Sequence, residues 1–570
     1  MSTYRPTITG ARHMISAGHY SGAHAGFQIL EAGGNAIDAG VAAGMALGIL
    51  QTDRVNFAGV APIMIYLAAK REIVNIDGLG TWPKAASLQY FHDKHGGKMP
   101  PGILRTVMPA APASWIAALE RYGTMSFGEV AREATRLARD GFAMHGFMAD
   151  YIADNIEGYQ RWPSSAAVFL PNGRPPQPGE RFVQSELAAS LQYMIDEEAA
   201  HRSEGRAAGL KAARDAFYRG DIAQKIAQYH KDNGGWVTAD DLAGYEVSFE
   251  KPVHTNFHGV DLYACGPWSQ GPVLPQTLNL LSGFDLKAMG HNSPAYIHTL
   301  VEALKLSFAD RHRYYGDPKF VKVPLDVLLS APYTDARRKL IRADAAAREM
   351  PAAGDVPGYN PATPLPAATP GKPNPPPDTS YVCVVDREGN AFSATPSDGS
   401  SATPVIPGTG FCPSSRGSQS STDPAHPAAL APGKRPRLTP NPALALKDGK
   451  VFMPFGSPGN DIQPQAMTQV FLNIVVFGME PQAAVEAPRF ATYSFPSSSA
   501  PHAYHPGRLN IESRVDNTVV GQLAKLGHQV APWDAVEWRA GAVCAIRVNE
   551  TNGLLEGAAD PRRPCYALGV

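Results

Sequence analysis

The stretch Asp378-Thr379-Ser380-Tyr381-Val382-Cys383-Val384-Val385-Asp386-Arg387-Glu388-Gly389-Asn390-Ala391-Phe392-Ser393-Ala394-Thr395 decides the fold. Its apolar run from Tyr381 to Val385 predicts a strand that is covered on both faces. The turn sequence Arg387-Glu388-Gly389-Asn390 and the short apolar run after it predict a hairpin. Thr379 would stand at the mouth of the first strand of this hairpin.

Thr379 becomes a nucleophile if the chain is cut just before it. The freed α-amine has a reference pKa of about 7.7–8.0, which suits a base near neutral pH. One residue would then supply both the nucleophilic hydroxyl and the base that activates it. The alternative is an ordinary threonine that opens a hairpin at the solvent edge.

Two segments far apart in the chain resemble the same family. Thr379-Ser-Tyr-Val-Cys-Val-Val-Asp-Arg-Glu-Gly-Asn-Ala resembles the small-subunit start of the γ-glutamyltranspeptidase family, whose members are N-terminal-nucleophile hydrolases that cleave themselves before this threonine. Residues 26–39, Gly-Phe-Gln-Ile-Leu-Glu-Ala-Gly-Gly-Asn-Ala-Ile-Asp-Ala, resemble the opening of the large subunit. The resemblance implies an α+β fold, a four-layer αββα sandwich. It also implies self-cleavage at Asp378–Thr379, in which the Thr379 hydroxyl attacks the Asp378 carbonyl and water opens the resulting ester.

A linker precedes the predicted cleavage bond. Residues 351–378 are rich in Pro, Ala and Gly with few apolar side chains, which predicts an extended, mobile segment. Mobility there suits self-cleavage, because the new ends must separate before substrate reaches Thr379. We expect one precursor to give a large subunit, 1–378, and a small subunit, 379–570, which stay associated. An ordinary interdomain linker is the alternative, although the strand that follows is too apolar to open an independent domain.

The composition excludes several classes of function. A net charge of −1 over 570 residues gives no electrostatic argument for a nucleic-acid or acidic-membrane partner. The most apolar stretch, Val41 to Leu50, is too short for a membrane span of about 20 residues, and the chain start lacks the pattern of a signal peptide, so we expect a cytoplasmic protein. The five cysteines include no Cys-x-x-Cys pair, which predicts buried free thiols rather than disulfides or a zinc site. With no phosphate loop either, we expect no cofactor and no metal.

Hydrophobic periodicity predicts elements around the hairpin. Helices are expected over Ala36–Leu50, whose small residues allow close packing on a sheet, and over Ser126–Asp140, which Ser126 would cap. Strands are expected over Pro62–Ala68, Glu72–Asp77 and Tyr245–Phe249.

Three further positions match the catalytic machinery that the resemblance implies. In the family a second hydroxyl, eighteen residues after the nucleophile, holds the nucleophile's oxygen, and Ser397 stands there. Gly456-Ser457-Pro458-Gly459-Asn460 resembles the family's Gly-Ser-Pro-Gly-Gly turn, so the backbone N–H groups of Gly459 and Asn460 would form the oxyanion hole. Asn460 replaces a glycine, which a backbone donor tolerates if the Asn is left-handed. A loop serine and a plain strand-to-helix turn are the alternatives.

The positions that would bind a γ-glutamyl group depart from the family pattern. Leu79 replaces an arginine that grips the α-carboxylate, and Gly399 replaces an asparagine in the same pocket. The acid that binds the α-amino group aligns near Gln419, and Leu438-Thr439 replaces a Ser-Ser pair. Because leucine cannot replace a charge-assisted bidentate partner, the γ-glutamyl anchor is largely lost. Arg437 is our candidate for gripping an anionic or polar acyl group, with a surface arginine as the alternative.

The sequence therefore predicts a self-processing amidohydrolase that cleaves a small non-γ-glutamyl amide through an acyl-enzyme on Thr379. It resembles a branch of the family that includes oxamate amidohydrolase, and hydrolysis is favoured over transfer because the amino-acid pocket is eroded. One alternative is a true γ-glutamyl hydrolase or transferase acting on glutathione-type substrates. The other is a non-catalytic relative that is never processed and acts as a binding protein. The oligomeric state is open, with a homo-oligomer of the processed heterodimer as one option.

Overall fold

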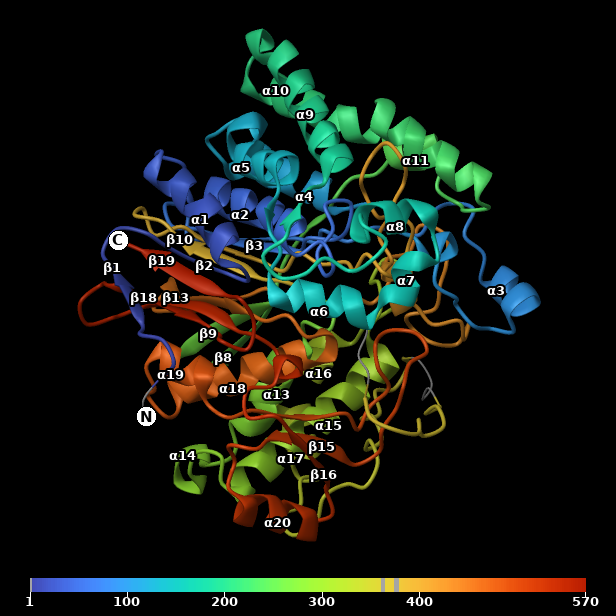
Figure 1. The fold of residues 1–570 in the computed structure, drawn as a ribbon. Helices are drawn as coiled ribbons and strands as arrows, with labels where there is room; N and C mark the ends of the chain where they lie inside the picture. The colour runs from blue at the N-terminus through green and yellow to red at the C-terminus, as the bar shows by residue number, and fades with distance from the viewer. Residues whose placement is uncertain (1–2, 360–363, 374–378) are drawn as a thin grey trace.

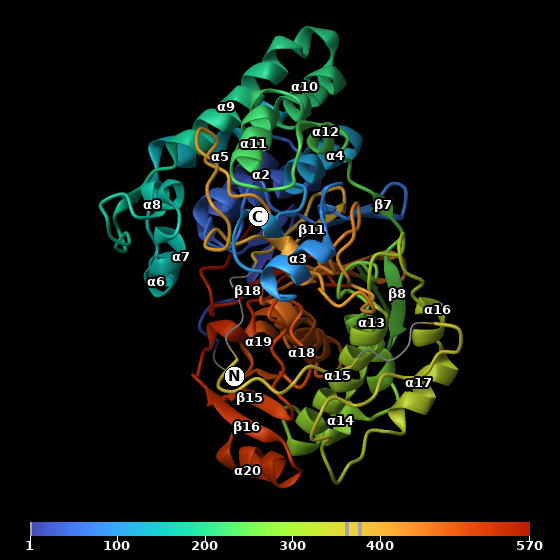
Figure 2. The same ribbon diagram turned by 90° about the vertical axis from the view of Figure 1, so that its right-hand side faces the viewer.

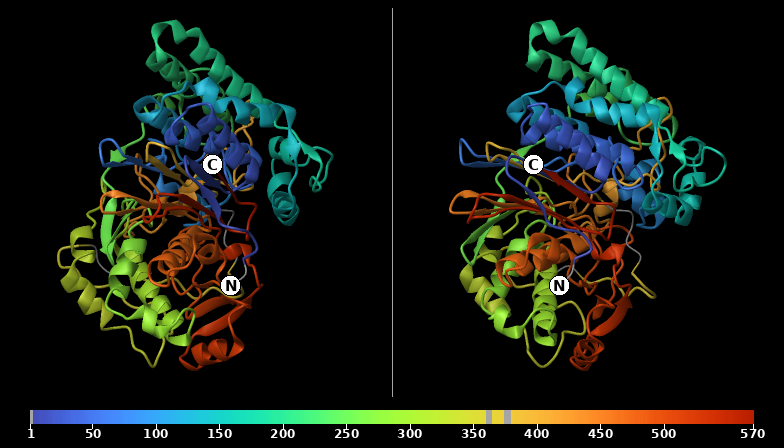
Figure 3. Two further views of the ribbon diagram at one scale, coloured as in Figure 1. Left: turned by 90° about the vertical axis from the view of Figure 1, so that its left-hand side faces the viewer. Right: turned by 60° about the vertical axis from the view of Figure 1, so that its left-hand side comes forward.

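The computed structural model describes residues 3–359, 364–373 and 379–570. Within these residues, two seven-stranded sheets lie face to face and helices cover the outer face of each (Figure 1). Seen edge-on, the layers run helix, sheet, sheet, helix (Figure 3). The predicted αββα sandwich is therefore confirmed.

The first sheet contains the predicted hairpin. In spatial order its strands are β19 (Tyr566–Gly569), β2 (Met14–Ala17), β10 (Val382–Val385), β11 (Ala391–Ala394), β3 (Ile63–Leu67), β4 (Glu72–Ile76) and β7 (Phe249–Glu250). β10 and β11 pair antiparallel, with Val382 opposite Ala394. The hairpin lies in the middle of the sheet, between β2 and β3. All four residues of β10 are buried, as the apolar run predicted.

The second sheet faces the first across an apolar layer. Its strands are β1 (Ile8–Gly10), β18 (Leu555–Ala559), β17 (Cys544–Val548), β13 (Lys450–Gly456), β12 (Ala443–Lys447), β9 (Val260–Ala264) and β8 (Val253–Phe257). β13 and β17 contact β10 directly. Tyr381 and Cys383 from the hairpin pack there with Leu444 and Cys544. All five cysteines of the chain are buried and unpaired, as expected.

Helices rich in small residues cover the first sheet. The helices of this half are α1 (Tyr20–Glu31), α2 (Ala36–Leu50), α3 (Leu88–His95), α4 (Ala111–Tyr122), α5 (Phe127–Asp140), α6 (Gly146–Asp154), α7 (Ile156–Gln160), α8 (Pro163–Phe169), α9 (Ser185–Ala200), α10 (Arg206–Tyr218), α11 (Asp221–Asp232) and α12 (Ala239–Ala243). α2 packs on β10 and β11 and is buried along its whole length. α9, α10 and α11 lie further out, beyond α2 and α5 (Figure 2). Capping boxes begin two of these helices where the sequence predicted a start, at Asn35 for α2 and at Ser126 for α5.

A second set of helices covers the other sheet. They are α13 (Val273–Leu281), α14 (Leu286–Met289), α15 (Pro294–Tyr314), α16 (Leu325–Leu328), α17 (Ala331–Arg338), α18 (Gln463–Val475), α19 (Pro481–Glu486) and α20 (Asn517–Lys525). α13 packs on β8 and β9, and α18 on β13. Two small sheets complete the fold, formed by β14 (Phe490–Thr492), β15 (Arg508–Glu512) and β16 (Gln529–Trp533), and by β5 (Phe142–Ala143) and β6 (Arg181–Phe182). Every helix in the described part of the chain is too short or too polar to span a bilayer.

One predicted strand is wrong over most of its length. Residues 245–248 form a loop after α12, and only Phe249 belongs to a strand. The loop runs along the end of β4, where the Ser248 carbonyl accepts from the Asp77 N–H and the Ser248 N–H donates to the Asp77 carboxylate. A side-chain acceptor thus replaces one rung of a regular ladder there.

Candidate active site

Thr379 lies three residues before β10 and is 1% exposed. An antiparallel bridge pairs it with Ser397, and the Ser380 N–H donates to the Pro396 carbonyl at 3.0 Å. This pairing continues the hairpin beyond β10 and β11, so the two hydroxyls that the sequence singled out meet. Thr379 Oγ1 and Ser397 Oγ are 2.8 Å apart. Asp378 and the rest of 374–378 lie outside the described residues, so the cleavage bond and this part of the linker remain predictions.

A buried arginine holds the second hydroxyl. Arg416, at the start of a 3₁₀ turn over Arg416–Gln419, donates from Nη2 to Ser397 Oγ, and its Nε lies 3.7 Å from Asp398 Oδ2. The Asp398 carboxylate also accepts from the hydroxyls of Ser414 and Ser415 at 2.5 and 2.6 Å. The sequence prediction missed Arg416, although it is the single lysine or arginine between residues 398 and 432.

The donors around Thr379 set the direction of its hydrogen bonds. A guanidinium only donates, so Ser397 Oγ accepts from Arg416, and the Ser397 proton is available to Thr379 Oγ1. Gln463, the first residue of α18, donates from Nε2 to the same Oγ1 at 3.4 Å. Arg563 donates to the Thr379 carbonyl at 3.4 Å. With two donors aimed at its oxygen, the Thr379 hydroxyl can pass its own proton to a base.

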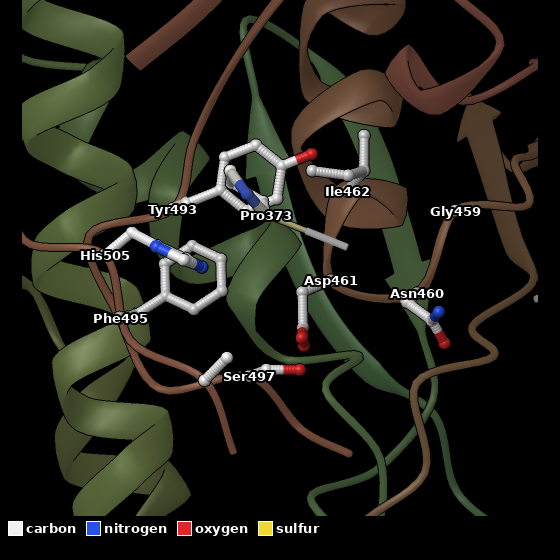
Figure 4. A pocket seen from close by; sticks show the side chains of 10 residues that line it. Pro373, Gly459, Asn460, Asp461, Ile462, Tyr493, Phe495, Ser497 and His505 are labelled. Carbon is white, nitrogen blue, oxygen red and sulfur yellow. The ribbon is translucent and has the colours of Figure 1, made fainter. Parts of the chain in front are cut away.

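The predicted oxyanion turn joins β13 to α18. Gly459 has φ 125° and Asn460 has φ 50°, so Asn460 takes the left-handed conformation that the sequence required of it. Gln463, three residues after Asn460, donates to Thr379 Oγ1 and so connects this turn to the proposed nucleophile. The turn lines a cavity of about 40 Å³ together with Pro373 and the rings of Tyr493 and Phe495 (Figure 4).

Two predicted substrate positions meet at this turn. Gln419 Nε2 donates to Thr439 Oγ1 at 2.8 Å, and the Thr439 N–H donates back to Gln419 Oε1 at 3.2 Å. Thr439 Oγ1 in turn donates to Asn460 Oδ1 at 3.4 Å. Gln270 Nε2 donates to the backbone carbonyls of Thr439 and Asn460 and so fixes these two residues relative to each other. These amide and hydroxyl side chains are uncharged, and Asp461, which pairs with Arg311, is the carboxylate among the residues that line the small cavity.

Leu79 and Gly399 supply no charge to the site. Leu79 is 1% exposed and belongs to the apolar layer between the sheets, with Trp268, Tyr381 and Leu438. Gly399 is buried in the loop that follows Asp398. Neither position offers a partner for a substrate carboxylate.

Arg435 binds the carboxylate of Asp77, two residues before Leu79, but it belongs to an ion-pair network. Arg435 pairs with Asp77 at 2.9 Å, with Glu250 at 2.7 Å and with Asp317 at 2.8 Å. Its Nη1 and Nη2 atoms are thus bonded to three carboxylates, which neutralise its charge. Arg435 therefore ties β4, β7 and the loop after α15 together and does not replace the lost arginine.

Arg437 lies apart from Thr379. It is 3% exposed, so the surface-arginine alternative is wrong. It lines a separate cavity of about 290 Å³, which Gln419 also lines. The structure thus brings Thr379, Ser397, Gly459, Asn460, Gln419 and Thr439 together through hydrogen bonds or shared elements, and Arg437 reaches them through the neighbouring cavity.

One group among the described residues has the spacing of metal ligands, namely His298, Glu302 and His528. His298 Nδ1 faces His528 Nε2 at 2.9 Å, and the Glu302 carboxylate binds the Lys305 ammonium at 2.7 Å. These contacts already engage the ligand atoms, and the ammonium would repel a cation. We assign no metal to this group.

Comparison with known proteins bears on the whole chain. A family model described as gamma-glutamyltranspeptidase matches residues 22–570. The chain is 34% identical to the Acylase ACY 1 proenzyme of Pseudomonas sp. (strain SE83), over 97% of this chain and 92% of that protein. It is 31% identical to the Glutathione hydrolase-like YwrD proenzyme of Bacillus subtilis (strain 168), over 99% of each. Among solved structures, the cephalosporin acylase from Bacillus halodurans is 26% identical, with a TM-score of 0.86 over 100% of this chain and 98% of that one.

Proposed function

The chain belongs to the gamma-glutamyltranspeptidase family, and we propose that it is a self-processing amidohydrolase whose nucleophile is Thr379. The observation that carries this proposal is the buried hydroxyl pair, Thr379 Oγ1 and Ser397 Oγ, 2.8 Å apart beside a donor-rich turn. An ordinary hairpin threonine needs neither a hydroxyl partner nor an arginine behind that partner. The names of two related proenzymes support processing as part of the same proposal.

Maturation and turnover use the same atoms. In the precursor, Thr379 Oγ1 attacks the Asp378 carbonyl carbon; the C–N bond breaks, the nitrogen takes the hydroxyl proton, and water hydrolyses the ester to give chains 1–378 and 379–570. In turnover, the freed α-amine takes the hydroxyl proton while Oγ1 attacks the substrate carbonyl. The backbone N–H groups of Gly459 and Asn460 stabilise the oxyanion. The proton then passes to the leaving amine, and water releases the acid.

The substrate is a non-γ-glutamyl amide under this proposal. The positions that would anchor a γ-glutamyl group are Leu79, Gly399, Gln419 and Thr439, and all four are uncharged. An α-carboxylate placed there would lose its charge-assisted partner, which costs more than a neutral hydrogen bond returns. The acylase name of one relative agrees with a substrate outside the γ-glutamyl class. Cytoplasmic location and oligomeric state stay predictions.

The intact mass of the purified protein tests the nucleophile. We expect two chains that meet at Asp378–Thr379, and a single uncut chain in Thr379→Ala. Thr135→Ala is the matched control, since it removes another buried threonine hydroxyl, one bonded within α5. A wild-type chain that stays uncut under all folding conditions would contradict the mechanism and favour the unprocessed binding protein.

A second measurement distinguishes an amidohydrolase for non-γ-glutamyl amides from a γ-glutamyl hydrolase or transferase. The processed protein is given γ-glutamyl 4-nitroanilide and simple acyl 4-nitroanilides side by side. Faster release from the acyl compounds is the expected result. Faster release from the γ-glutamyl compound would favour the glutathione-type alternative.

A further inference from the structure

We propose that the cavity lined by Arg437 binds a carboxylate carried by the amide substrate, with Arg437 and His426 as its donors. This inference rests on the proposed function and narrows the substrate class to amides with a free carboxylate. The cavity measures about 290 Å³ and lies next to the oxyanion turn.

The polar lining of this cavity is dominated by basic side chains. Arg437, His312, His426 and His502 all line it. Its one carboxylate is that of Asp423, which is exposed and accepts from the Ala425 N–H at 2.9 Å. Within the described residues, no carboxylate forms an ion pair with Arg437. The cavity therefore presents the Arg437 cation and N–H donors, and its one lining carboxylate belongs to the exposed Asp423.

Arg437 is a buried cation with spare donors. Its Nη1 donates to the Arg311 carbonyl at 3.2 Å, and its Nε has no hydrogen-bond partner among the described residues. Burial and the nearby Arg311 lower the pKa of Arg437 to about 9, which leaves it protonated at neutral pH. Asp461 is committed to Arg311, with which it pairs. An uncompensated buried charge is costly, and an anion entering the cavity would relieve that cost.

The imidazoles add neutral donors. His426 Nδ1 accepts from the Ala428 N–H at 3.0 Å, so its Nε2 carries the proton and can donate. Burial lowers the pKa of His312 to about 3 and that of His426 well below its usual value, so both rings are neutral. The two rings pack edge to face with centroids 5.0 Å apart. Both ring nitrogens of His502 face carbonyl oxygens, those of Ser497 and Ser420.

The cavity and the catalytic turn share a wall. Ser497 lines both the Arg437 cavity and the small cavity at Gly459 and Asn460. Gln419 also lines the Arg437 cavity and bonds to Thr439 at the turn. A substrate whose amide lies at the turn can therefore place a charged end against Arg437.

Described residues of the segment before Thr379, within 364–373, line the same two cavities. Pro364 to Pro366 line the Arg437 cavity, and Pro373 lines the small cavity (Figure 4). Thr369 anchors the segment through two hydrogen bonds with the backbone of Tyr504. In the uncut chain these residues cover both cavities, so cleavage would free the path that we infer for the substrate.

Matched amides that differ by one carboxylate test the proposal on the processed enzyme. In the acyl arm, the anilides of succinic and glutaric acid are compared with butyric anilide. In the amine arm, butyryl 4-aminobenzoate is compared with butyric anilide, so the two arms show which end of the substrate carries the charge. We expect kcat/KM to favour the carboxylate member in one arm, and Arg437→Met to reduce that preference by about 10- to 100-fold. Arg437→Lys keeps the charge without the planar guanidinium, and its preference for the carboxylate member is expected to lie between those of the wild type and Arg437→Met.

The control is Arg139→Met, which removes an exposed arginine paired with Asp140 and is expected to leave the preference unchanged. Equal kcat/KM within both arms, or an unchanged preference in Arg437→Met, overturns the carboxylate site while the amidohydrolase stands. If Arg437→Met does not fold, the kcat/KM preference of the wild type and its reduction in Arg437→Lys test the carboxylate site instead.

If no amide is turned over, the proposed function fails, and calorimetry with free glutarate and glutaramide decides the site. Binding of glutarate alone, lost in an Arg437 variant, supports it. Equal binding or no binding overturns it.

Discussion

At the scale of single residues, Arg416 fixes the direction of the hydrogen bond between Ser397 and Thr379. Arg416→Met removes both the donor and the charge, and kcat is expected to fall about 10- to 100-fold, as for the loss of one charge-assisted hydrogen bond. KM should change less, because Arg416 acts through Ser397 rather than on the substrate. Steady-state kinetics of the processed enzyme and the rate of self-cleavage, followed by intact mass, check this.

Arg416→Lys is the companion variant. It retains a positive donor at the same place and is expected to recover part of kcat. An unchanged kcat in Arg416→Met would show that Ser397 needs no positioning residue.

Sequence alone could predict part of this site. The family resemblance predicts that Ser397 holds the Thr379 oxygen, and in the structure the register of the hairpin places the two residues opposite each other. Arg416 and Arg437 lie in irregular segments without periodicity, and only tertiary packing decides where their side chains go. The sequence left a surface arginine open as the alternative for Arg437, and the burial of its side chain excludes that alternative.

At the scale of elements, α2 can approach the hairpin because it carries glycines. A Cβ at Gly40 would lie 2.1 Å from the ring of Phe392 on β11, whereas a Cβ at Gly48 would meet nothing closer than 3.5 Å. Gly40→Ala is therefore expected to destabilise the fold by about 1–3 kcal/mol. Gly48→Ala should stabilise it by about 0.5–1 kcal/mol, because alanine favours a helix interior. Denaturant unfolding of both variants checks this, and equal effects would show that α2 can shift away from the sheet.

The turn between β13 and α18 offers a second test at this scale. If the Asn460 backbone N–H is the oxyanion donor, Asn460→Gly keeps the donor and suits φ 50° better, so kcat should stay within about threefold of wild type. Asn460→Ala keeps the same N–H, yet a left-handed alanine costs about 1–2 kcal/mol, which should appear in stability. Kinetics and thermal unfolding are measured on both variants. A loss of kcat near 100-fold in Asn460→Gly would mean that the side chain, not the backbone, does the work.

The sequence predicted the start of a helix correctly where a capping residue marks it. Asn35 and Ser126 begin α2 and α5 through reciprocal side-chain bonds that the sequence itself encodes. The predicted strand over 245–249 is wrong because residues 245–248 form a loop that bonds to Asp77 at the end of β4, a contact between positions far apart in the chain. The order of strands within each sheet likewise depends on partners far apart in the chain, which no local pattern specifies.

At the scale of the whole molecule, both sheets mix strands from the two sides of the predicted cut. β10 and β11 of the small chain lie between β2 and β3 of the large chain, and β12 of the small chain pairs with β9 of the large one. The two chains cannot part without breaking both sheets and exposing the apolar layer between them. The cut protein should therefore elute as one species under native conditions.

Cutting also changes how the molecule unfolds. Once the bond before Thr379 is broken, unfolding separates two chains, so the denaturant midpoint of the processed protein should rise with protein concentration. The uncut Thr379→Ala variant keeps one chain, and its midpoint should not depend on concentration. Unfolding curves of both proteins at several concentrations, with fragment masses read from the eluted peaks, check this. A small chain that elutes alone, or unfolds before the large one, would contradict a shared core.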